Sequence, residues 1–367
     1  MVCIFCTKTI RTFVKNNQQF KIILSQINHL LVIRLSAMGD VAMAVPVLKA
    51  LEKQYPTLKI TVLSKPFLKP LFDGLKNVSF YAAEVDRKHK GFFGIYKLFK
   101  ELKSFDIDAV ADLHNVLRSK ILRSFFKLAM AKVTFVDKGR SEKRALTQSK
   151  NKVFKQLKTT HERYADVFRN LGFDLDLSSP EFPPKKELTP EILEITSTKN
   201  TKWIGIAPFA TYKTKMYPLD LMEEVISELS QQPVKILLFG GGKKEIELLE
   251  NLANKFPAAI NVAGKLKLNQ ELALISNLDN MVSMDSGNAH FAAMLGINTI
   301  TIWGITHPFA GFSPFNQPFE NSLLPDLKKY PNIPCSIYGN KVCEGYDDVM
   351  RSISPKTIVK KVLDTLI

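Results

Sequence analysis

The expected fold is decided by one stretch, Leu31-Val-Ile-Arg-Leu-Ser-Ala-Met-Gly-Asp-Val-Ala-Met-Ala-Val-Pro46. The apolar run from Leu30 to Ile33 predicts a buried strand, which a short loop of polar and small residues follows. Helical spacing of apolar residues then predicts a helix from Asp40 to Gln54. Such a strand, glycine turn and helix N-terminus present backbone N–H groups that suit a phosphate. Asp40 begins the helix, either as a cap only or as a carboxylate that faces a site.

The same alternation of short apolar runs and helical segments fills both halves of the chain. The strands are expected at 30–34, 58–63, 78–81, 109–113 and 132–136, then at 202–207, 234–239, 259–262, 280–284 and 299–302. The helices are expected at 40–54, 66–74, 91–103, 116–128 and 160–171, then at 219–230, 244–255, 269–276, 287–295 and 355–367. Nearly continuous apolar strands that alternate with helices are typical of a doubly wound parallel sheet.

A proline-rich break separates two such sheets. Residues 178–190 contain four prolines and no apolar period, so they read as a linker. We expect an α/β protein with an N-terminal Rossmann-like domain over 30–177 and a C-terminal one over 191–352, followed by a helix over 353–367. A ligand would then bind in the cleft between the sheets, at the carboxyl ends of the strands.

The charge is strongly basic and unevenly spread. The formal net charge is +16, and the segment from Arg87 to Lys158 alone holds 19 Lys/Arg against 6 Asp/Glu. Aromatic residues such as Phe92 and Phe93 lie among these cations. The segment is either a solvated basic face over core aromatics or a surface for nucleic acid, anionic lipid or a phosphorylated substrate.

Residues 1–29 form a basic leader without an acidic residue, which we expect to be disordered. Its apolar pieces are too short for a secretory signal, and the whole chain has no apolar run of the roughly 18 residues that a membrane span needs. The four cysteines are Cys3, Cys6, Cys335 and Cys343. A four-thiolate zinc site would need distant pairs to meet, and although Cys335 and Cys343 could bridge, reduced thiols are the default expectation.

Four loops at expected strand ends hold polar residues. The first contains Ser36, Gly39 and Asp40, and the second, 207–218, holds two lysines without an acid, as an anion pocket would. The third, Gly240-Gly-Gly-Lys-Lys-Glu245, lacks the order of a nucleotide triphosphatase loop, and no GxGxxG follows a strand. The fourth is Ser283-Met-Asp-Ser-Gly-Asn-Ala-His290. Each loop alone is an ordinary cap or turn, but four of them in two facing sheets favour a site.

At these loops the chain resembles the bacterial lipopolysaccharide heptosyltransferases, glycosyltransferase family nine. The resemblance runs from about Leu30 to the C-terminus. It rests on Arg34-Leu-Ser-Ala-Met-Gly-Asp-Val41, Lys215-Met-Tyr-Pro218 and Asp285-Ser-Gly-Asn-Ala-His290, which occur in the family's order. Asp112-Leu-His-Asn115 and His161-Glu-Arg-Tyr164 also look like family positions. The resemblance implies a GT-B fold and inverting transfer of heptose from ADP-heptose to the inner core (lipid A/Kdo) of lipopolysaccharide.

The family's roles carry over to matching positions. Asp40 would deprotonate the acceptor hydroxyl, and Lys215 would neutralise the leaving diphosphate. The implied donor-binding residues are Thr211, Lys215, Glu245, Leu266, Asp285, Ser286, Gly287 and His290. The implied acceptor-binding residues are Ser36, Gly39, Arg118 and Lys120.

Neither a metal nor another cofactor is implied. The expected partners are a nucleotide sugar and a lipid-linked saccharide, and no nucleic acid is expected. The resemblance implies a cytoplasmic protein in peripheral contact with the anionic inner face of the inner membrane. Three alternatives stay open: a family member that uses a different sugar or glycan, a catalytically silent paralogue that binds sugar nucleotides, and a nucleic-acid-binding protein that uses the basic face.

Overall fold

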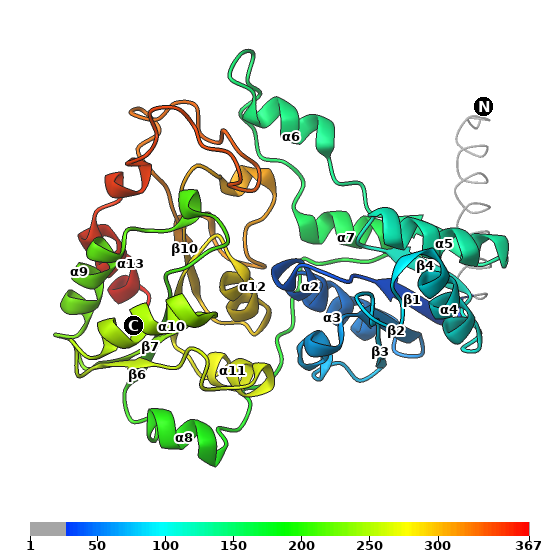
Figure 1. Ribbon diagram of the computed structural model, residues 1–367, viewed down its shortest axis with the longest axis horizontal. Helices are drawn as coiled ribbons and strands as arrows, with labels where there is room; N and C mark the ends of the chain where they lie inside the picture. The colour runs from blue at the N-terminus through cyan, green and yellow to red at the C-terminus, as the bar shows by residue number, and fades with distance from the viewer. Residues whose placement is uncertain (1–26, 367) are drawn as a thin grey trace, which may run out of the picture. The chain divides into compact units, whose positions relative to one another are not determined.

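The computed structural model describes residues 27–366, which form two compact α/β units (Figure 1). The first unit holds residues 27–36, 47–137 and 162–179. The second holds residues 37–46, 138–161 and 180–366. Predictions for the leader fall on residues 1–26, which lie outside the described residues, whereas His29 already belongs to the first strand.

The first unit is built on a five-stranded sheet with the strand order β3-β2-β1-β4-β5. Its strands are β1 (His29–Ile33), β2 (Lys59–Ser64), β3 (Val78–Ala82), β4 (Ala109–Asp112) and β5 (Lys132–Phe135). Each neighbouring pair is parallel. The apolar run that opened the sequence argument is the central strand, and it is fully buried from Leu30 to Ile33, as a strand covered on both faces requires.

Helices cover this sheet through apolar stripes. They are α3 (Ala44–Gln54), α4 (Gly91–Lys103), α5 (Leu117–Leu128), α7 (Thr160–Arg169) and the 3₁₀ segment η1 (Pro66–Phe72). Helices α4 and α5 lie side by side (Figure 1). Leu98 and Leu102 of α4 and Leu122 and Phe126 of α5 share one core with the buried side chains of β1 and β4.

The second unit is built on a six-stranded sheet with the strand order β11-β10-β9-β6-β7-β8, and its pairings are again parallel. Its strands are β6 (Lys202–Ala207), β7 (Val234–Leu238), β8 (Ala259–Asn261), β9 (Asn280–Met284), β10 (Thr299–Ile302) and β11 (Ser322–Leu323). Its helices are α2 (Met38–Ala42), α6 (Arg140–Thr147), α8 (Pro190–Thr196), α9 (Leu219–Leu229), α10 (Lys243–Ala253), α11 (Leu268–Ile275), α12 (Gly287–Met294) and α13 (Pro355–Asp364). Short 3₁₀ turns are η2 (Lys213–Lys215), η3 (Pro308–Ala310), η4 (Phe319–Asn321) and η5 (Val349–Ser352).

Two segments from early in the sequence belong to this second unit because of what they contact. Helix α2 packs on α12, and the segment 138–161 packs through Leu146 and Leu157 on Ala310 and its apolar neighbours. The Leu157 amide donates to the Phe309 carbonyl at 2.9 Å, and the Thr160 amide donates to the Gly311 carbonyl at 2.8 Å. The two units that the contacts define therefore have different boundaries from the predicted domains, which were continuous in sequence. Helix α13 also belongs to the second unit, where it lies beside α9 (Figure 1).

The doubly wound α/β class is confirmed, and α4, β6, β9 and β10 have the bounds that the apolar pattern predicts. The single helix predicted over 40–54 is wrong, since the chain forms α2 and α3 with a break at Met43. Pro46 explains the break. Proline has no backbone N–H to donate to the carbonyl of residue 42, and its ring crowds that carbonyl in a continuous helix. The helix predicted over 66–74 is a 3₁₀ segment with Pro70 inside it.

Asp112 ends β4 as a fully buried carboxylate with three donors. It accepts hydrogen bonds from the amides of His114 and Asn115 at 2.9 and 2.8 Å, and from Arg123 Nη1 at 2.8 Å. We expect Asp112→Ala to lower the free energy of unfolding by about 3 kcal/mol, because it removes the carboxylate that pairs with the mostly buried Arg123 guanidinium and takes the acceptor from two amides. Urea unfolding measures this change. The surface pair Lys69–Asp73 provides the control, since Asp73→Ala should cost no more than about 0.5 kcal/mol; equal losses in the two variants would contradict the prediction.

Candidate active site

A cavity of about 340 Å³ lies in the second unit. It is lined by Ala37, Gly39, Asp40, Met43, Thr211, Tyr212, Lys215, Asp285, Ser286, Gly287, His290, Phe312, Ile337 and Tyr338. Half of these residues stand after two adjacent parallel strands: the 211–215 loop follows β6, and residues 285–290 follow the neighbouring strand β9. Carboxyl ends of neighbouring parallel strands meet at one edge of a sheet, which is where α/β proteins bind ligands.

A buried ion pair forms the charged centre of the cavity. Lys215 Nζ lies 2.9 Å from Asp285 Oδ2, and the two side chains are only 14% and 9% exposed. The buried hydroxyl of Thr306 donates to the same oxygen at 3.0 Å, so it fixes the carboxylate. Asp285 thus holds the lysine ammonium in the cavity wall. Because the pair is largely shielded from solvent, its electrostatic interactions are stronger than they would be in water.

The N-terminus of α12 opens onto the same cavity. Ser286 has an extended backbone (φ −147°) at the helix cap, and its hydroxyl lies 3.1 Å from that of Ser283 rather than on a backbone amide. The first amides of α12 therefore carry no side-chain cap from Ser286. Free helix N–H groups together with a lysine make an anion site suited to a phosphate.

Gly39 allows α2 to approach α12 closely. A Cβ atom at Gly39 would lie 3.0 Å from His290 Cδ2 and 3.3 Å from Gly287 Cα, which is tighter than ordinary packing. Gly287 meets Gly39 in return, since a Cβ there would lie 3.8 Å from the Gly39 amide nitrogen. Glycine at position 39 thus allows the approach that brings Asp40, from early in the chain, to the cavity that the β6 and β9 loops form.

Asp40 both caps its helix and lines the cavity. Its Oδ2 accepts a hydrogen bond from the Ala37 amide at 3.2 Å, so it caps α2 from the third helical position. The same half-buried side chain lines the cavity. A carboxylate whose position is fixed by its own helix is well placed to receive a proton from a bound hydroxyl.

His290 is buried in the cavity wall and stays neutral at physiological pH. Burial lowers the pKa of His290, although the carboxylates of Asp285 and Asp40 oppose this shift and the Lys215 ammonium adds to it. Its Nδ1 has no hydrogen-bond partner among the described residues. A neutral imidazole beside two carboxylates can accept or donate a single hydrogen bond to a ligand.

The cavity brings together most of the predicted donor residues, namely Thr211, Lys215, Asp285, Ser286, Gly287 and His290, and also Gly39 and Asp40. Glu245 and Leu266 do not line it. Glu245 follows β7, where its Oε2 accepts a hydrogen bond from the Gly241 amide at 2.7 Å, and Leu266 follows β8. These two strands continue the sheet beyond β6, so both residues lie along the same carboxyl edge.

Three predicted acceptor residues belong to the first unit. Ser36 follows β1, and Arg118 and Lys120 lie exposed in the first turns of α5. Arg118 Nη2 lies 3.8 Å from Asp86 Oδ1.

Sequence reasoning missed several cavity residues. Tyr212 lies in a loop that was singled out, but Phe312, Ile337 and Tyr338 come from chain segments without strand or helix periodicity. The spacing of Cys335 and Cys343 was the available signal for the last two, because it marks a short closed loop around them.

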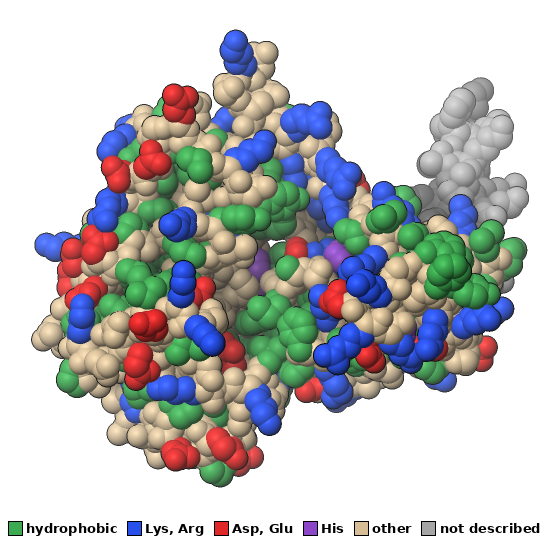
Figure 2. Space-filling model, viewed as in Figure 1, with side chains coloured by type: hydrophobic (Ala, Val, Ile, Leu, Met, Phe, Trp, Pro, Cys, Tyr) green, Lys and Arg blue, Asp and Glu red, His purple; other side chains and the backbone are tan. Residues whose placement is uncertain are grey.

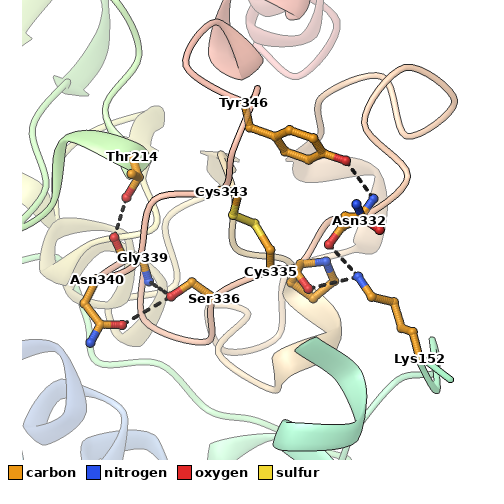
Figure 3. Close-up of a disulfide and its surroundings, with 10 residues drawn as sticks. Lys152, Thr214, Asn332, Cys335, Ser336, Gly339, Asn340, Cys343 and Tyr346 are labelled. Carbon is orange, nitrogen blue, oxygen red and sulfur yellow. Dashed lines mark hydrogen bonds between the residues drawn. A yellow bond between two sulfur atoms is a disulfide. The ribbon is translucent and has the colours of Figure 1, made fainter. Parts of the chain in front are cut away.

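The expectation of reduced thiols is wrong for this pair: the structure joins Cys335 and Cys343 in a disulfide, with their Cα atoms 6.3 Å apart (Figure 3).

The arrangement of the cavity suits group transfer from a diphosphate. Lys215 and the α12 amides can stabilise the charge on a leaving phosphate, and Asp40 can act as a base. Within residues 27–366, no cluster of three or more His, Cys, Asp or Glu side chains is arranged to hold a metal ion.

The fold is that of GT-B glycosyltransferases. A glycosyltransferase of family 9 from Veillonella parvula superposes with a TM-score of 0.72 at 19% identity, over 92% of this chain and 97% of that one. The structure of ADP-heptose lps heptosyltransferase II from Escherichia coli superposes with a TM-score of 0.66 at 20% identity, over 92% of this chain and 98% of that one.

The sequence shows the family. A model described as glycosyltransferase family 9 (heptosyltransferase) matches residues 95–335, and the chain belongs to this family. The lipopolysaccharide core heptosyltransferase OpsX of Haemophilus influenzae is 27% identical, over 78% of this chain and 82% of that protein. Lipopolysaccharide heptosyltransferase 1 of Campylobacter coli is 25% identical, over 90% of this chain and 97% of that protein. The family resemblance read from the three motifs is thereby confirmed.

His161, in the first turn of α7, makes the stability of the second unit sensitive to acid. Burial lowers its pKa from 6.5 to about 3, and the neighbouring His290 adds to the shift. The unfolded chain therefore binds a proton below pH 6.5 that the folded chain excludes, so stability falls as the pH drops through this range. We expect a loss of about 2 kcal/mol between pH 7 and pH 5 from this group.

His161→Leu should remove that part of the loss, which thermal unfolding at pH 7 and pH 5 measures. Lys356→Leu, which also replaces a basic residue by leucine but at an exposed position, serves as the control and should leave the difference in stability between the two pH values unchanged. An unchanged difference between the two pH values in His161→Leu would contradict the prediction.

Proposed function

We propose that this protein is an inverting glycosyltransferase that transfers heptose from ADP-heptose to a lipid-linked inner-core acceptor of lipopolysaccharide. The observation that carries the proposal is the meeting of Asp40, the Lys215–Asp285 pair and the α12 N-terminus in one cavity. The family supports the choice of substrate class, because the curated relatives described above are lipopolysaccharide heptosyltransferases.

The proposed reaction is a direct displacement at the anomeric carbon of the donor sugar. Asp40 takes the proton of the acceptor hydroxyl as the hydroxyl oxygen forms a bond to that carbon. The bond from the carbon to the diphosphate oxygen breaks on the opposite face, so the configuration inverts. The negative charge that develops on the leaving ADP is stabilised by Lys215 and by the amides of Ser286 and Gly287.

The rest of the donor follows the edge of the second sheet. With the diphosphate at Lys215 and α12, the nucleoside extends past β6 toward the ends of β7 and β8, where Glu245 and Leu266 lie. In this proposal Glu245 binds the ribose, Thr211 the diphosphate, and His290 and Asp285 the sugar. Ser36, Gly39, Arg118 and Lys120 are assigned to the acceptor.

A lipid-linked acceptor requires contact with a membrane surface, and in the described part of the chain no helix is both long and apolar enough to cross one. We therefore propose peripheral attachment to the cytoplasmic side of the inner membrane through a surface on α4 and α5, named here the α4–α5 face. Its exposed apolar residues are Phe92, Phe93, Tyr96, Leu117, Leu128 and Met130. Its exposed cations are Lys90, Lys97, Lys100, Arg118, Lys120 and Lys127.

The α4–α5 face combines apolar exposure with positive charge, as Figure 2 shows. Phe93 and Leu128 are 85% and 81% exposed. The Phe92 ring lies 5.7 Å from that of the half-buried Phe125, which packs in turn on the buried Phe99, so an aromatic cluster supports the exposed rings. Side chains of this kind enter the boundary between headgroups and acyl chains, while each nearby cation adds about 1 kcal/mol on an anionic surface.

Substitution of the proposed base separates chemistry from donor binding. We expect Asp40→Asn to lower kcat at least about 100-fold with ADP-heptose and a lipopolysaccharide acceptor, because proton removal is lost. Its affinity for ADP, measured by calorimetry, should stay within about twofold. Lys215→Ala should instead weaken ADP binding as well as turnover, because it removes the cation that meets the diphosphate. Unchanged turnover in Asp40→Asn would exclude Asp40 as the base.

Vesicle flotation tests the membrane surface. We expect the protein to float with phosphatidylglycerol vesicles and not with neutral phosphatidylcholine vesicles, and Phe93→Ser/Leu128→Ser to reduce the bound fraction about tenfold. Phe319→Ser is the matched control, since this exposed phenylalanine belongs to the second unit. Equal flotation of the double variant and the control would show that another surface binds the membrane.

A further inference from the structure

The disulfide closes a short loop, residues 335–343, that is held firmly at its base (Figure 3). The Cys335 amide donates to the Ile305 carbonyl at 3.3 Å. Lys152 Nζ donates to the Pro334 carbonyl at 3.1 Å, and the Asn332 amide donates to the Tyr346 hydroxyl at 2.9 Å. These contacts anchor the chain on both sides of the two cysteines.

The interior of the loop is a tight turn. The Ser336 hydroxyl accepts a hydrogen bond from the Gly339 amide at 3.0 Å and donates to Asn340 Oδ1 at 3.2 Å. Gly339 has a φ of +79°, a left-handed conformation that glycine adopts without strain. The turn is therefore defined by its own hydrogen bonds as well as by the disulfide.

The tip of the loop lies directly on the segment that carries Lys215. The Thr214 hydroxyl donates to the Gly339 carbonyl, as Figure 3 shows. A Cβ atom at Gly339 would lie 2.6 Å from Lys215 Cγ and 3.2 Å from Thr214 Oγ1. Only a residue without a side chain leaves room here for the stem of the lysine. The neighbouring Ile337 and Tyr338 line the cavity.

We propose that the loop 335–343 is a positioning element for Lys215, and that the Cys335–Cys343 disulfide sets donor affinity by holding this loop in place. The proposal rests on the proposed function, in which Lys215 meets the diphosphate. Asp285 fixes the lysine ammonium from one side and the Gly339 backbone confines its stem from the other. Together they leave the lysine one arrangement, so little conformational entropy is lost when the donor binds.

Reduction of the disulfide releases this constraint. A dithiol reductant gives two electrons and two protons, the S–S bond breaks, two cysteine thiols form, and the reductant becomes a disulfide. The loop then keeps its Ser336 turn but loses its covalent closure. The proposal predicts a higher KM for ADP-heptose and a higher Kd for ADP after reduction, while the KM for the acceptor stays the same.

Two glycine variants separate positioning from backbone strain. Gly339 and Gly345 have φ values of +79° and +73°, but a Cβ atom at Gly345 meets nothing within 4 Å. Gly339→Ala and Gly345→Ala therefore strain the backbone alike, and only the first meets Lys215. We expect Gly339→Ala to raise the Kd for ADP about tenfold and Gly345→Ala to leave it within twofold, with similar melting temperatures.

A double-mutant cycle shows whether the effect acts through Lys215. Without the lysine stem, the new Cβ atom of Gly339→Ala keeps only its 3.2 Å approach to Thr214 Oγ1. Gly339→Ala should therefore change the Kd for ADP of Lys215→Ala by less than about twofold. Additive losses, or equal Kd values for Gly339→Ala and Gly345→Ala, would overturn the positioning role of the loop.

The disulfide is tested in a Cys3→Ser/Cys6→Ser background, which leaves only Cys335 and Cys343. Titration of free thiols should give none before and two after treatment with dithiothreitol, and the Kd for ADP should rise about fivefold on reduction. The Cys335→Ser/Cys343→Ser variant should have the Kd for ADP of the reduced protein, and dithiothreitol should not change that Kd. Equal Kd values for ADP in the oxidised and the reduced protein would overturn the inference and leave the proposed function intact. Absence of ADP binding in both states would overturn the proposed function and the inference with it.

Discussion

The candidate site depends on the close approach of α2 to α12. At Gly39 the two helices meet without a side chain between them, since a Cβ atom there would lie 3.0 Å from His290 Cδ2 and 3.3 Å from Gly287 Cα. The contact has a chemical consequence, because it joins a carboxylate from the beginning of the chain to a cation and a helix N-terminus from its second half. The proposed base and the proposed diphosphate site therefore belong to the same compact unit of the fold.

The electrostatics of the cavity follow from this packing. Two carboxylates, a lysine and a histidine line one small cavity, and Asp285 forms an ion pair with Lys215. Thr306 holds Asp285, the α2 backbone holds Asp40, and burial keeps His290 neutral. The charges are thus fixed before a ligand arrives, which is how a protein stabilises a developing charge without reorganising around it.

The sequence predicted the periodic and local features well and the long-range ones poorly. Strands that are buried along almost their whole length, such as β6 and β9, have the predicted limits because a mainly apolar run defines each of them. The loops that follow them were found for the same reason, and with them Lys215, Asp285 and His290.

Helix α6 was missed, because in a helix with the sequence Arg-Ser-Glu-Lys-Arg-Ala-Leu-Thr only Lys143 and Leu146 are buried. Tyr338 and Phe312 were missed because nothing local marks them; their place in the cavity is decided by a disulfide and by packing between distant segments. Residues held by such tertiary contacts carry no period that a linear pattern can reveal.

The way the contacts partition the chain limits how its parts can be recombined. The backbone passes between the two units five times, at 36/37, 46/47, 137/138, 161/162 and 179/180. A fragment that starts at residue 180 would contain Lys215 and Asp285 but not Asp40, nor the α6 segment that covers Phe312. Exchange of a whole sugar-nucleotide module between two members of the family therefore requires three separate grafts, and a single crossover in the gene would produce a protein with an incomplete site.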